Sequence, residues 1–520
     1  MTKLLTSEQM READRQTIEA LGLPGVVLME NAGAGVVELL RTRLPDLPQR
    51  RVLVLAGRGN NGGDGFVIAR RLKMSGVSAQ VILFGRGEQL QGDARINWQV
   101  FQNLRGRVIE IAGEEVPEFF NGILAHSGVV VDAVFGTGLK KPVAGVIGEI
   151  FQRVNRSGKP VIAVDIPSGV SADSGQVLGE ALQADWTVTF AAEKIGHRTY
   201  PGAELSGEVM TVPIGIPDKF IDIPAHRVAR NLPDDLVIPQ RPEAGHKGSF
   251  GHLLVVAGGE GKAGAAVLTA SGALRTGPGL VTVASPRSVQ DQVATQLTEA
   301  MTLPLPEDGK TGGLGAGAVD KIRHCNLEPD ALALGPGLGI NHAIHGIVLE
   351  IIERWDVPTV VDADALNVFS GAADEIAALA GSRSAPLVLT PHPGELGRIL
   401  GCSVVEIQGD RLGVACQHAA RWGVWLVLKG AGTVIAAPTG EAWINDSGNS
   451  GLAAGGSGDL LTGIIGGLLT QGWPVESAVR AGVWLHGAAA DAAVVESGPA
   501  GLMARDLLPH LRLLVNDLLF

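Results

Sequence analysis

The chain has 520 residues, a formal net charge of −12 and 45% hydrophobic residues, which is enough apolar material for more than one packed core. The acidic balance argues against nucleic acid or an anionic membrane as a partner, because both attract clustered lysine and arginine. Residues 1–11 lack the apolar segment of a secretory signal, and no apolar run is long enough to span a membrane. The sequence therefore predicts a soluble, cytoplasmic protein.

The cysteine and glycine content of the chain excludes further classes of protein. The three cysteines show no Cys-x-x-Cys or metal-ligand spacing, which argues against a disulfide framework or a zinc site. Glycine, with 72 residues, is about twice as frequent as usual and follows no three-residue period, so a collagen-like chain is excluded. So much glycine indicates many tight backbone turns, which are typical of proteins that bind phosphates or nucleotides.

The first predicted elements alternate between helix and strand. A capping box, Thr6-Ser7-Glu8-Gln9, predicts a helix that ends near Gly22. Beyond it, short apolar runs alternate with stretches of helical spacing. The predicted strands are 51–56, 77–84, 129–135 and 160–166, and the predicted helices include 66–74 and 146–156. This alternation predicts a mostly parallel sheet covered on both faces.

A proline-rich segment separates two such regions. Residues 217–242 contain five prolines without periodicity, which indicates a linker or an exposed connection. The alternation then resumes, with predicted strands at 252–257, 280–285, 331–334, 359–361, 387–390 and 425–428. The sequence thus predicts two α/β domains, 1–220 and 235–520, joined by a linker at 221–234.

The first glycine-rich turn, Gly57-Arg58-Gly59-Asn60-Asn61-Gly62, follows a predicted strand and matches the dinucleotide pattern Gly-x-Gly-x-x-Gly. A standard dinucleotide fold also needs an acidic residue at the end of the next strand, but that strand ends Ile82-Leu83-Phe84-Gly85. The loop instead offers oxygens of Asn60, Asn61 and Asp64 to hydroxyl groups or a hard monovalent cation. The same residues also suit a simple tight turn.

Two further strand ends carry similar residues. One strand leads to Asp132 and the turn Gly136-Thr137-Gly138, and the next leads to Asp165 and Pro167-Ser168-Gly169. Ligands of open α/β sheets collect at the carboxyl ends of the strands. Three such ends with Asn, Asp and glycine indicate one binding crevice.

These motifs closely resemble those of the NAD(P)H-hydrate epimerases, and the resemblance covers most of residues 1–220. The motifs are Asn60–Gly65, Asp132, 136–138 and 165–169. The resemblance implies a Rossmann-like three-layer α/β/α sandwich in which Asn61, Asp132 and Ser168 hold a potassium ion. It implies that the hydrated nicotinamide nucleotide is bound by Asn60, Asn61, Gly62, Gly63, Asp64, Gly136, Thr137, Gly138, Leu139, Lys140, Lys141, Pro142 and Asp165. Asp165 becomes the acid/base candidate, because inverting the hydroxyl-bearing carbon requires proton movement at the departing oxygen.

The most informative stretch of the second region is 449–459, where four glycines precede Asp459 and an apolar helix, 460–469. Such glycines before a helix predict several N–H groups that point into one concavity. The helix macrodipole is expected to keep the Asp459 carboxylate ionised, so that it can accept a hydroxyl proton during phosphoryl transfer. An ordinary helix cap would also place an aspartate here. A Walker A loop is excluded because Gly261-Lys262 is followed by Ala263.

Five more motifs join this stretch: Lys247–His252, Gly335–Gly339, Asp362–Asn367, Thr390–Glu395 and Lys429–Thr433. Together they resemble the ribokinase-like superfamily, and within it the ADP/ATP-dependent NAD(P)H-hydrate dehydratases, over nearly all of 235–520. Ala454 departs from this pattern, where a threonine is expected. The resemblance implies magnesium and ADP (or ATP) as phosphoryl donor, with nucleotide contacts from Lys429, Gly430, Ala431, Gly432, Thr433 and Gly458. It implies substrate contacts from Ala265, Gly337, His392 and Asp459, with Asp459 as the catalytic base.

Both resemblances together imply a bifunctional repair enzyme, a homo-oligomer that acts on the hydrated nucleotides NADHX and NADPHX. One domain would interconvert the R and S epimers, and the other would dehydrate the S epimer. Two alternatives stay open. A ribokinase-like small-molecule kinase fused to a nucleotide-binding scaffold domain would release a stable phosphate ester. A non-catalytic binding module would be expected to lose the set formed by Asn61, Asp132 and Ser168, which this chain retains.

Overall fold

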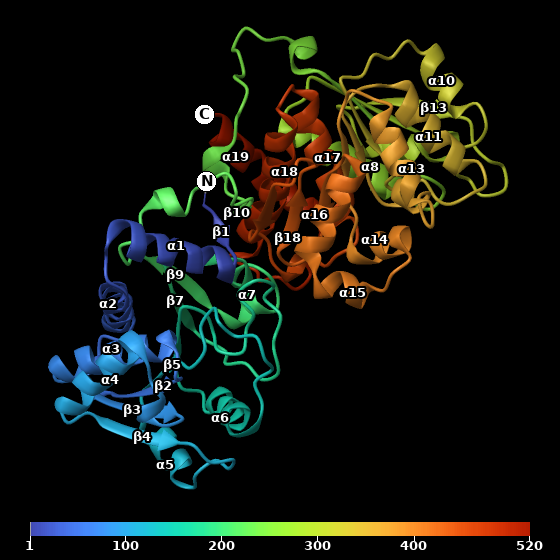
Figure 1. Cartoon of the computed structure of the whole chain (residues 1–520). Coiled ribbons are helices and arrows are strands. Elements are labelled where there is room, and N and C mark those ends of the chain that lie inside the picture. The colour runs from blue at the N-terminus through green and yellow to red at the C-terminus, as the bar shows by residue number, and fades with distance from the viewer. Residues whose placement is uncertain (1) are drawn as a thin grey trace. The chain divides into compact units, whose positions relative to one another are not determined.

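The computed structural model describes residues 2–520, which form two compact units, Thr2–Val228 and Ala229–Phe520 (Figure 1). Each unit is built around a mostly parallel sheet with helices on both faces, so the predicted α/β class of the two domains is confirmed. None of the described helices is both long and apolar enough to cross a membrane.

The sheet of the first unit has seven parallel strands. Their order is β4 (Arg107–Ile111), β3 (Ser78–Phe84), β2 (Arg51–Ala56), β5 (Val129–Ala133), β6 (Val161–Val164), β7 (Trp186–Phe190) and β9 (Glu208–Val212). The order reverses between β2 and β5, since β3 and β4 extend the sheet to one side and β5 to β9 to the other. Such a switch point is where open α/β sheets bind their ligands.

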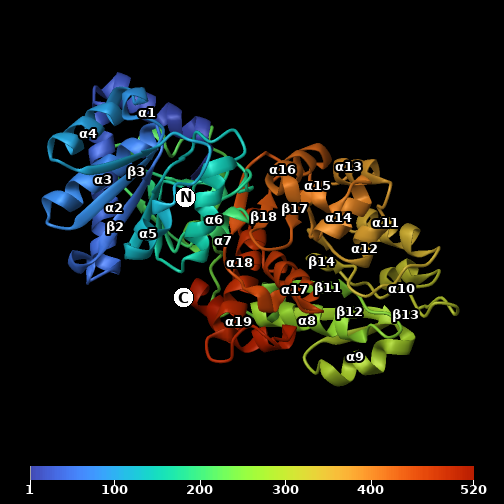
Figure 2. The same ribbon diagram turned by 90° about the horizontal axis from the view of Figure 1, so that it is seen from below.

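Alternating side chains of β2 show the layers of this unit. Val52 and Val54 pack into one apolar core with α1 (Ser7–Leu21), α2 (Gly25–Arg43), α3 (Asn60–Met74) and α4 (Gly92–Asn103). Leu53 and Leu55 pack into another with α5 (Phe119–His126) and α6 (Gly145–Arg156). Figure 2 shows α3 and α4 on the opposite side of this sheet from α5 and α6. The predicted three-layer sandwich is thereby confirmed. The unit also contains the short strands β1 (Leu4–Leu5) and β8 (Glu193–Lys194), which pair with each other, and the short helix α7 (Gly202–Leu205).

Helix α1 begins where the capping box predicts. The Thr6 hydroxyl accepts a hydrogen bond from the Gln9 backbone N–H, and the Gln9 side chain accepts one from the Thr6 N–H. The helix ends at Gly22, which has a left-handed conformation with φ of 73°. Both predicted ends of this helix are confirmed.

The polar segment Asn60–Gly65 is not the loop that the sequence predicts, because it forms the start of α3. Its glycines are packing residues. A Cβ atom on Gly62 would lie 1.9 Å from the carbonyl oxygen of Gly57, and one on Gly65 would lie 2.8 Å from Ala133. The low helix propensity of glycine is outweighed here because only glycine lets the helix start lie so close to the strand ends.

The sheet of the second unit has ten strands. Their order is β10 (Val228–Arg230), β19 (Ala442–Asn445), β18 (Thr433–Ala436), β17 (Trp425–Leu428), β16 (Leu387–Leu389), β15 (Thr359–Val361), β14 (Ala331–Leu334), β11 (His252–Val256), β12 (Leu280–Pro286) and β13 (Met301–Leu305). Strand β18 runs antiparallel to β17 and β19, and the pairs from β17 to β13 are parallel. The order reverses between β11 and β14, which is the switch point of this sheet.

Two apolar cores flank this sheet as well. One contains α8 (Ala263–Thr276), α9 (Gln290–Gln296), α17 (Ser457–Thr470), α18 (Val475–Val494) and α19 (Leu507–Leu519). The other contains α10 (Ala318–His324), α11 (Ile344–Arg354), α12 (Asp364–Asn367), α13 (Ala373–Gly381), α14 (Pro393–Leu400), α15 (Val404–Gly409) and α16 (Arg411–Trp422). The strands predicted in this region match β11, β12, β14, β15, β16 and β17 within two residues.

Candidate active sites

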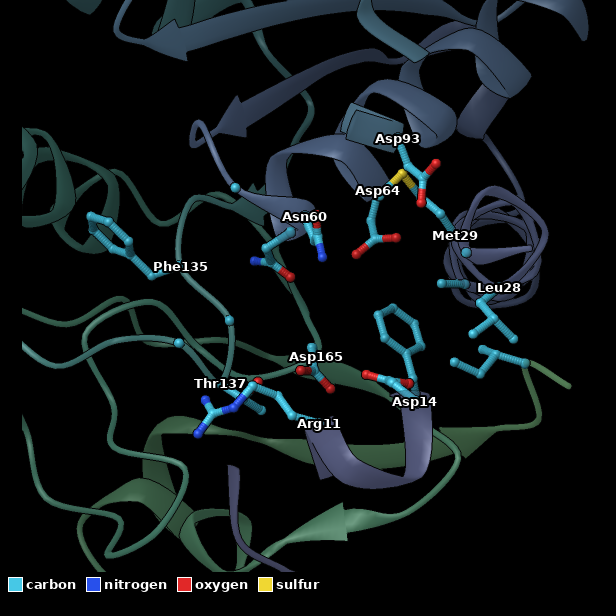
Figure 3. A pocket seen from close by; sticks show the side chains of 18 of the residues that line it. Arg11, Asp14, Leu28, Met29, Asn60, Asp64, Asp93, Phe135, Thr137 and Asp165 are labelled. Atoms are coloured by element: carbon cyan, nitrogen blue, oxygen red, sulfur yellow. The ribbon is translucent and has the colours of Figure 1, made fainter. Parts of the chain in front are cut away.

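The first unit has a cavity of about 550 Å³ at its switch point (Figure 3). Three strand ends contribute to its wall, namely Arg58–Asn61 after β2, Val134–Leu139 after β5, and Asp165 after β6. Helices α1 and α2 supply further lining residues, among them Arg11, Asp14 and Met29. Three strand ends therefore share one crevice, as the sequence predicts.

Asp165 is held in place by a buried lysine. Lys194 Nζ lies 2.5 Å from Asp165 Oδ1, and the Thr189 hydroxyl donates to the same oxygen over 3.1 Å. The ring Nε2 of His197 lies 2.9 Å from the Asp165 carbonyl oxygen. Burial acts to raise the pKa of Asp165, but Lys194, His197 and Thr189 outweigh it, and the net pKa is lowered. Asp165 is thus a fixed, ionised carboxylate at the cavity wall.

Three more carboxyl groups line this space, Asp93 from α4, Asp64 from α3 and Asp14 from the middle of α1 (Figure 3). The pKa values of the last two are shifted. Burial raises the pKa of Asp64 well above its ordinary value, and the negative charges of Asp165 and Asp14 add to the rise. Burial also raises the pKa of Asp14 to about 6, with Lys194 opposing the rise and Asp165 adding to it. Lys194 pairs directly with Asp165 and not with Asp64 or Asp14. The carboxyl groups of Asp64 and Asp14 therefore keep their protons to a higher pH than Asp165 does.

The three residues predicted to bind potassium lie at or after the carboxyl ends of β2, β5 and β6. The Ser168 hydroxyl donates to Asp132 Oδ1 over 2.6 Å, and the Ser168 N–H donates to Asp132 Oδ2 over 2.7 Å. Burial raises the pKa of Asp132 to about 6, although these hydrogen bonds lower it. Asn61 lies beside Gly136, and its buried Nδ2 has no hydrogen-bond partner within residues 2–520.

The cavity brings together many of the residues predicted to bind substrate. Its lining includes Asn60, Asn61, Asp64, Gly136, Thr137, Gly138, Leu139 and Asp165. Its lining does not include the predicted residues Gly62, Gly63, Lys140, Lys141 and Pro142. Sequence reasoning missed Asp14 and Lys194. Lys194 could have been found as a charge that follows an apolar strand, β7, whereas Asp14 sits in an otherwise polar helix and gives no signal of its own.

A second lysine, partly buried, organises the site of the other unit. Lys429 Nζ, directly after β17, lies 2.7 Å from Asp362 Oδ1 and 3.9 Å from Glu395 Oε2. The Thr462 hydroxyl, from α17, donates to Asp362 Oδ2 over 2.8 Å. Burial acts to lower the pKa of Lys429, but Asp362 and Glu395 outweigh it, so the pKa is raised and the ammonium stays charged. Residues after β15, β16 and β17 thus meet at one point beside α17.

Asp459 lies in the first turn of α17 next to this cluster. The helix begins after Gly456, whose φ of 86° is a left-handed conformation that favours glycine. Burial raises the pKa of Asp459 to about 6, with Asp362 adding to the rise and Lys429 opposing it. Burial and like charges thus act against the helix macrodipole, and a pKa of about 6 still leaves the carboxylate mainly ionised at neutral pH. A pKa near 6 is closer to the optimum for a base at neutral pH.

A side-chain contact from α18 supports the start of α17. The Ser457 hydroxyl lies 3.1 Å from Nε2 of His486, a buried residue on α18. Burial lowers the pKa of His486 to about 4, so the imidazole is neutral. On the other side, a Cβ atom on Gly458 would lie 3.1 Å from Lys429 Nζ. The first turn of α17 is therefore adjacent to the Lys429 ammonium.

The predicted nucleotide loop, Lys429–Thr433, is supported by a buried arginine. Arg411 donates to the carbonyl oxygens of Leu428, over 3.0 Å, and Lys429, over 3.3 Å. Gly430 has φ of 138°, and a Cβ atom there would lie 3.1 Å from the Arg411 guanidinium. The Thr433 hydroxyl donates to the Gly430 carbonyl oxygen over 2.8 Å. The loop is a rigid turn that leaves Gly430 and Ala431 exposed.

The remaining predicted substrate contacts lie at neighbouring strand ends. His392 caps α14, where its Nδ1 accepts a hydrogen bond from the Gly394 N–H over 3.0 Å, and about half of its side chain is exposed. Ala265, on α8, lies against Gly337, because a Cβ atom on Gly337 would be 2.9 Å from the Ala265 Cβ. The structure thus places Ala265 and Gly337 together at the switch point and His392 two strands away.

Comparisons with known proteins match both units. The family model of NAD(P)H-hydrate dehydratases matches residues 253–512, and that of the YjeF-related protein N-terminus matches residues 25–196. A relative from Moorella thermoacetica, named bifunctional NAD(P)H-hydrate repair enzyme Nnr, is 43% identical over 99% of this chain and 97% of its own. A relative of the same name from Escherichia coli is 35% identical over 98% of this chain and 93% of its own.

Solved structures match the chain as well. One of them is the ADP/ATP-dependent NAD(P)H-hydrate dehydratase from Bacillus subtilis, co-crystallised with ATP/Mg²⁺. The two chains are 34% identical, with a TM-score of 0.47, and the match covers 54% of this chain and 94% of that one.

Proposed function

The chain belongs to the family of bifunctional NAD(P)H-hydrate repair enzymes, and we propose that Thr2–Val228 epimerises hydrated NADH and NADPH while Ala229–Phe520 dehydrates them. Two family models, one on each unit, and a relative matched along nearly its whole length support this division of labour. Spontaneous hydration gives two epimers. A dehydratase that accepts the S epimer alone needs an epimerase to supply it from the R epimer.

In the epimerase unit, the substrate ring occupies the cavity at the switch point. Polar side chains of Asn60 and Thr137 line this cavity and are suited to hold the nucleotide, and Asp64 offers a protonated carboxyl. Asp165 is the proposed acid/base group. Its carboxylate is kept charged by Lys194, so it accepts a proton more readily than it donates one at neutral pH.

The donor set formed by Asn61, Asp132 and Ser168 fits a potassium ion. All three supply oxygen atoms, which are the ligands of hard cations. One observation agrees with a bound cation, namely the buried carboxyl group of Asp132, whose negative charge a cation would stabilise. When bound, the ion would supply a positive charge for the nucleotide's phosphates.

In the dehydratase unit, Asp459 removes the proton from the ring hydroxyl, whose oxygen attacks the terminal phosphorus of ADP. The bond from that phosphorus to the bridging oxygen breaks, and AMP leaves. The N–H groups at the start of α17 and the Lys429 ammonium stabilise the negative charge on the transferred group. The phosphorylated oxygen then departs as inorganic phosphate, the neighbouring carbon loses a proton, and the ring double bond is restored.

The residues around Asp459 fit a nucleotide with magnesium. Lys429–Thr433 combines a charged side chain with exposed glycine backbone, which suits phosphate binding. The negative charges of Asp362, Asp364 and Glu395 already raise the pKa of Asp459, so a divalent cation would lower the repulsion at this point. Magnesium usually binds through one or two carboxylates together with substrate phosphates.

The single observation that carries the proposal is the position of Asp459, partly buried in the first turn of a glycine-led helix beside the Lys429–Asp362 pair. The test incubates the full chain with mixed NADHX epimers, ADP, Mg²⁺ and K⁺. We expect the near-ultraviolet absorbance of NADH to return together with an equal amount of inorganic phosphate. A stable phosphate ester without recovered absorbance would instead identify a small-molecule kinase.

The preference for ADP over ATP, the cytoplasmic location and the homo-oligomeric state remain predictions from the sequence. The nucleotide preference is measured in the same assay by replacing ADP with ATP at equal concentration.

A further inference from the structure

The epimerase cavity holds a carboxyl group for which the proposed function has no role so far. Asp14 lines the cavity from α1, one helical turn after Arg11, which lines it too. Within residues 2–520 the Asp14 carboxyl makes no hydrogen bond or ion pair. Its oxygens are therefore available to a ligand in the cavity (Figure 3).

The Asp165 carboxylate, in contrast to that of Asp14, is paired with neighbouring side chains. Its Oδ1 contacts Lys194 at 2.5 Å and Thr189 at 3.1 Å, and its backbone has φ of 69°, a conformation that side-chain-bearing residues seldom adopt. The ammonium of Lys194 favours the charged carboxylate. Asp165 is thus unprotonated before the reaction and is a poor source of a proton. As a weak base it can still accept a proton from a water molecule that becomes acidic as it bonds to the ring carbon.

An epimerisation at this carbon needs a proton source. The hydroxyl group of the hydrated ring is bonded to the carbon next to the ring nitrogen, and hydroxide is a poor leaving group. A carboxyl group whose pKa is raised towards neutrality can supply that proton. Burial gives Asp14 this property, since its pKa is raised to about 6.

The titratable and charged groups that line the cavity or act on Asp14 come from several elements. They are Arg11 on its own helix, Arg58 and Asp64 at the start of α3, Asp93 on α4, Asp165 after β6, and Lys194 on β8. Lys194 is engaged with Asp165, so its charge is already compensated. Enzymes commonly assign acid and base roles to two carboxyls whose surroundings differ in this way.

Building on the proposed epimerase function, we propose that Asp14 is the catalytic acid that protonates the departing ring hydroxyl, while Asp165 is the base for the incoming water. The C–O bond breaks and its electron pair leaves with the oxygen, which becomes water by taking the Asp14 proton. The lone pair of the ring nitrogen forms a C=N bond. Water then adds to the carbon on the other face, its proton passes to Asp165, and the nitrogen regains its lone pair. Solvent returns the proton from Asp165 to Asp14.

The test uses the full chain of Asp14→Asn with mixed NADHX epimers, ADP, Mg²⁺ and K⁺. The wild type is expected to restore the whole mixture to NADH. The variant is expected to restore the S epimer at the normal rate, because dehydration takes place in the other unit, and the R epimer at least about 100-fold more slowly than the wild type. KM for epimerisation should change by less than about threefold. Glu8→Gln, an exposed carboxylate on the same helix, is the matched control and should behave as the wild type.

A second variant separates chemistry from folding. Asp14→Glu keeps the carboxyl group and should recover at least about a tenth of the wild-type epimerisation rate. The proposal is overturned if Asp14→Asn epimerises within about threefold of the wild type, or if Asp14→Glu binds substrate normally and is as slow as Asp14→Asn. A wild type that restores only the S epimer would instead contradict the proposed epimerase function itself.

Discussion

Both units place one lysine among several carboxyl groups near the carboxyl ends of sheet strands. Lys194 pairs with Asp165 at 2.5 Å in the first unit, and Lys429 pairs with Asp362 at 2.7 Å in the second. Each lysine leaves a neighbouring aspartate without such a pair, and burial raises the pKa of that aspartate, Asp14 or Asp459, to about 6. A group that exchanges protons near neutral pH thus results from pairing its neighbour and burying the group itself.

The two units differ in the backbone around that aspartate. Asp459 lies in the first turn of α17 after a left-handed glycine, whereas Asp14 lies in the middle of α1. Free N–H groups at a helix start stabilise charge that develops on a phosphoryl group. Proton transfer to a ring hydroxyl creates no such anion, so a carboxyl on the flank of a helix is sufficient. The backbone setting therefore reflects the reaction of each unit.

The largest effect is expected when the aspartate of the second unit loses its carboxylate. Asp459→Asn should lower dehydration by about 10³-fold with ADP affinity unchanged, because the amide cannot accept the hydroxyl proton. Turnover is measured by the return of NADH absorbance, and affinity by calorimetric titration. Asp320→Asn is a matched control, since Asp320 occupies the same position in the first turn of α10 and is exposed. Equal turnover of the two variants would contradict the assigned role.

The second-largest effect is expected on the stability of the protein, when the buried lysine of the first unit, Lys194, is replaced. Lys194→Met leaves Asp165 buried without its counter-ion, which is expected to lower the free energy of unfolding by about 3 kcal/mol at neutral pH. In the wild type the lowered pKa of Asp165 contributes stability above the unfolded-state pKa, and this contribution is lost as pH falls through the folded-state value. The loss caused by Lys194→Met should therefore shrink as the solution is acidified. Calorimetric unfolding of the full chain measures both values, and a loss that is independent of pH would refute the pairing argument.

The smallest effect is expected from the cation. Replacing K⁺ by choline at constant ionic strength should slow epimerisation several-fold, because Asn61, Asp132 and Ser168 would lack the charge that they are proposed to hold. Asn61→Ala should make the rate insensitive to K⁺. An unchanged K⁺ dependence in Asn61→Ala would place the cation elsewhere.

Much of this arrangement could be predicted from the sequence. Parallel strands buried on both faces are continuous apolar runs, which is why β2, β14 and β17 were predicted at their observed bounds. The strand-end motifs were found because glycine next to Asn or Asp is a local signal. The antiparallel pair β18 and β19 was missed, since strands of only four residues carry little pattern.

The missed parts depend on contacts between distant segments. The start of α3 was predicted as a loop because glycine disfavours helices, and only the close approach of Gly62 to Gly57 explains its helical state. Asp14 gives no local signal, because nothing around it in α1 shows that a strand end 150 residues later faces it. Raised pKa values are tertiary properties of this kind.

The most direct test of the acid and base roles assigned to Asp14 and Asp459 is the pH dependence of both reactions, measured on the same chain. Dehydration needs ionised Asp459, so its kcat/KM should fall about tenfold per pH unit below about 6. Epimerisation needs protonated Asp14, so its kcat/KM, corrected for the uncatalysed rate, should fall about tenfold per pH unit above about 6. Two limbs of opposite slope that meet near this pH are the predicted result. Two profiles of the same slope would contradict the assignment of one aspartate as base and the other as acid.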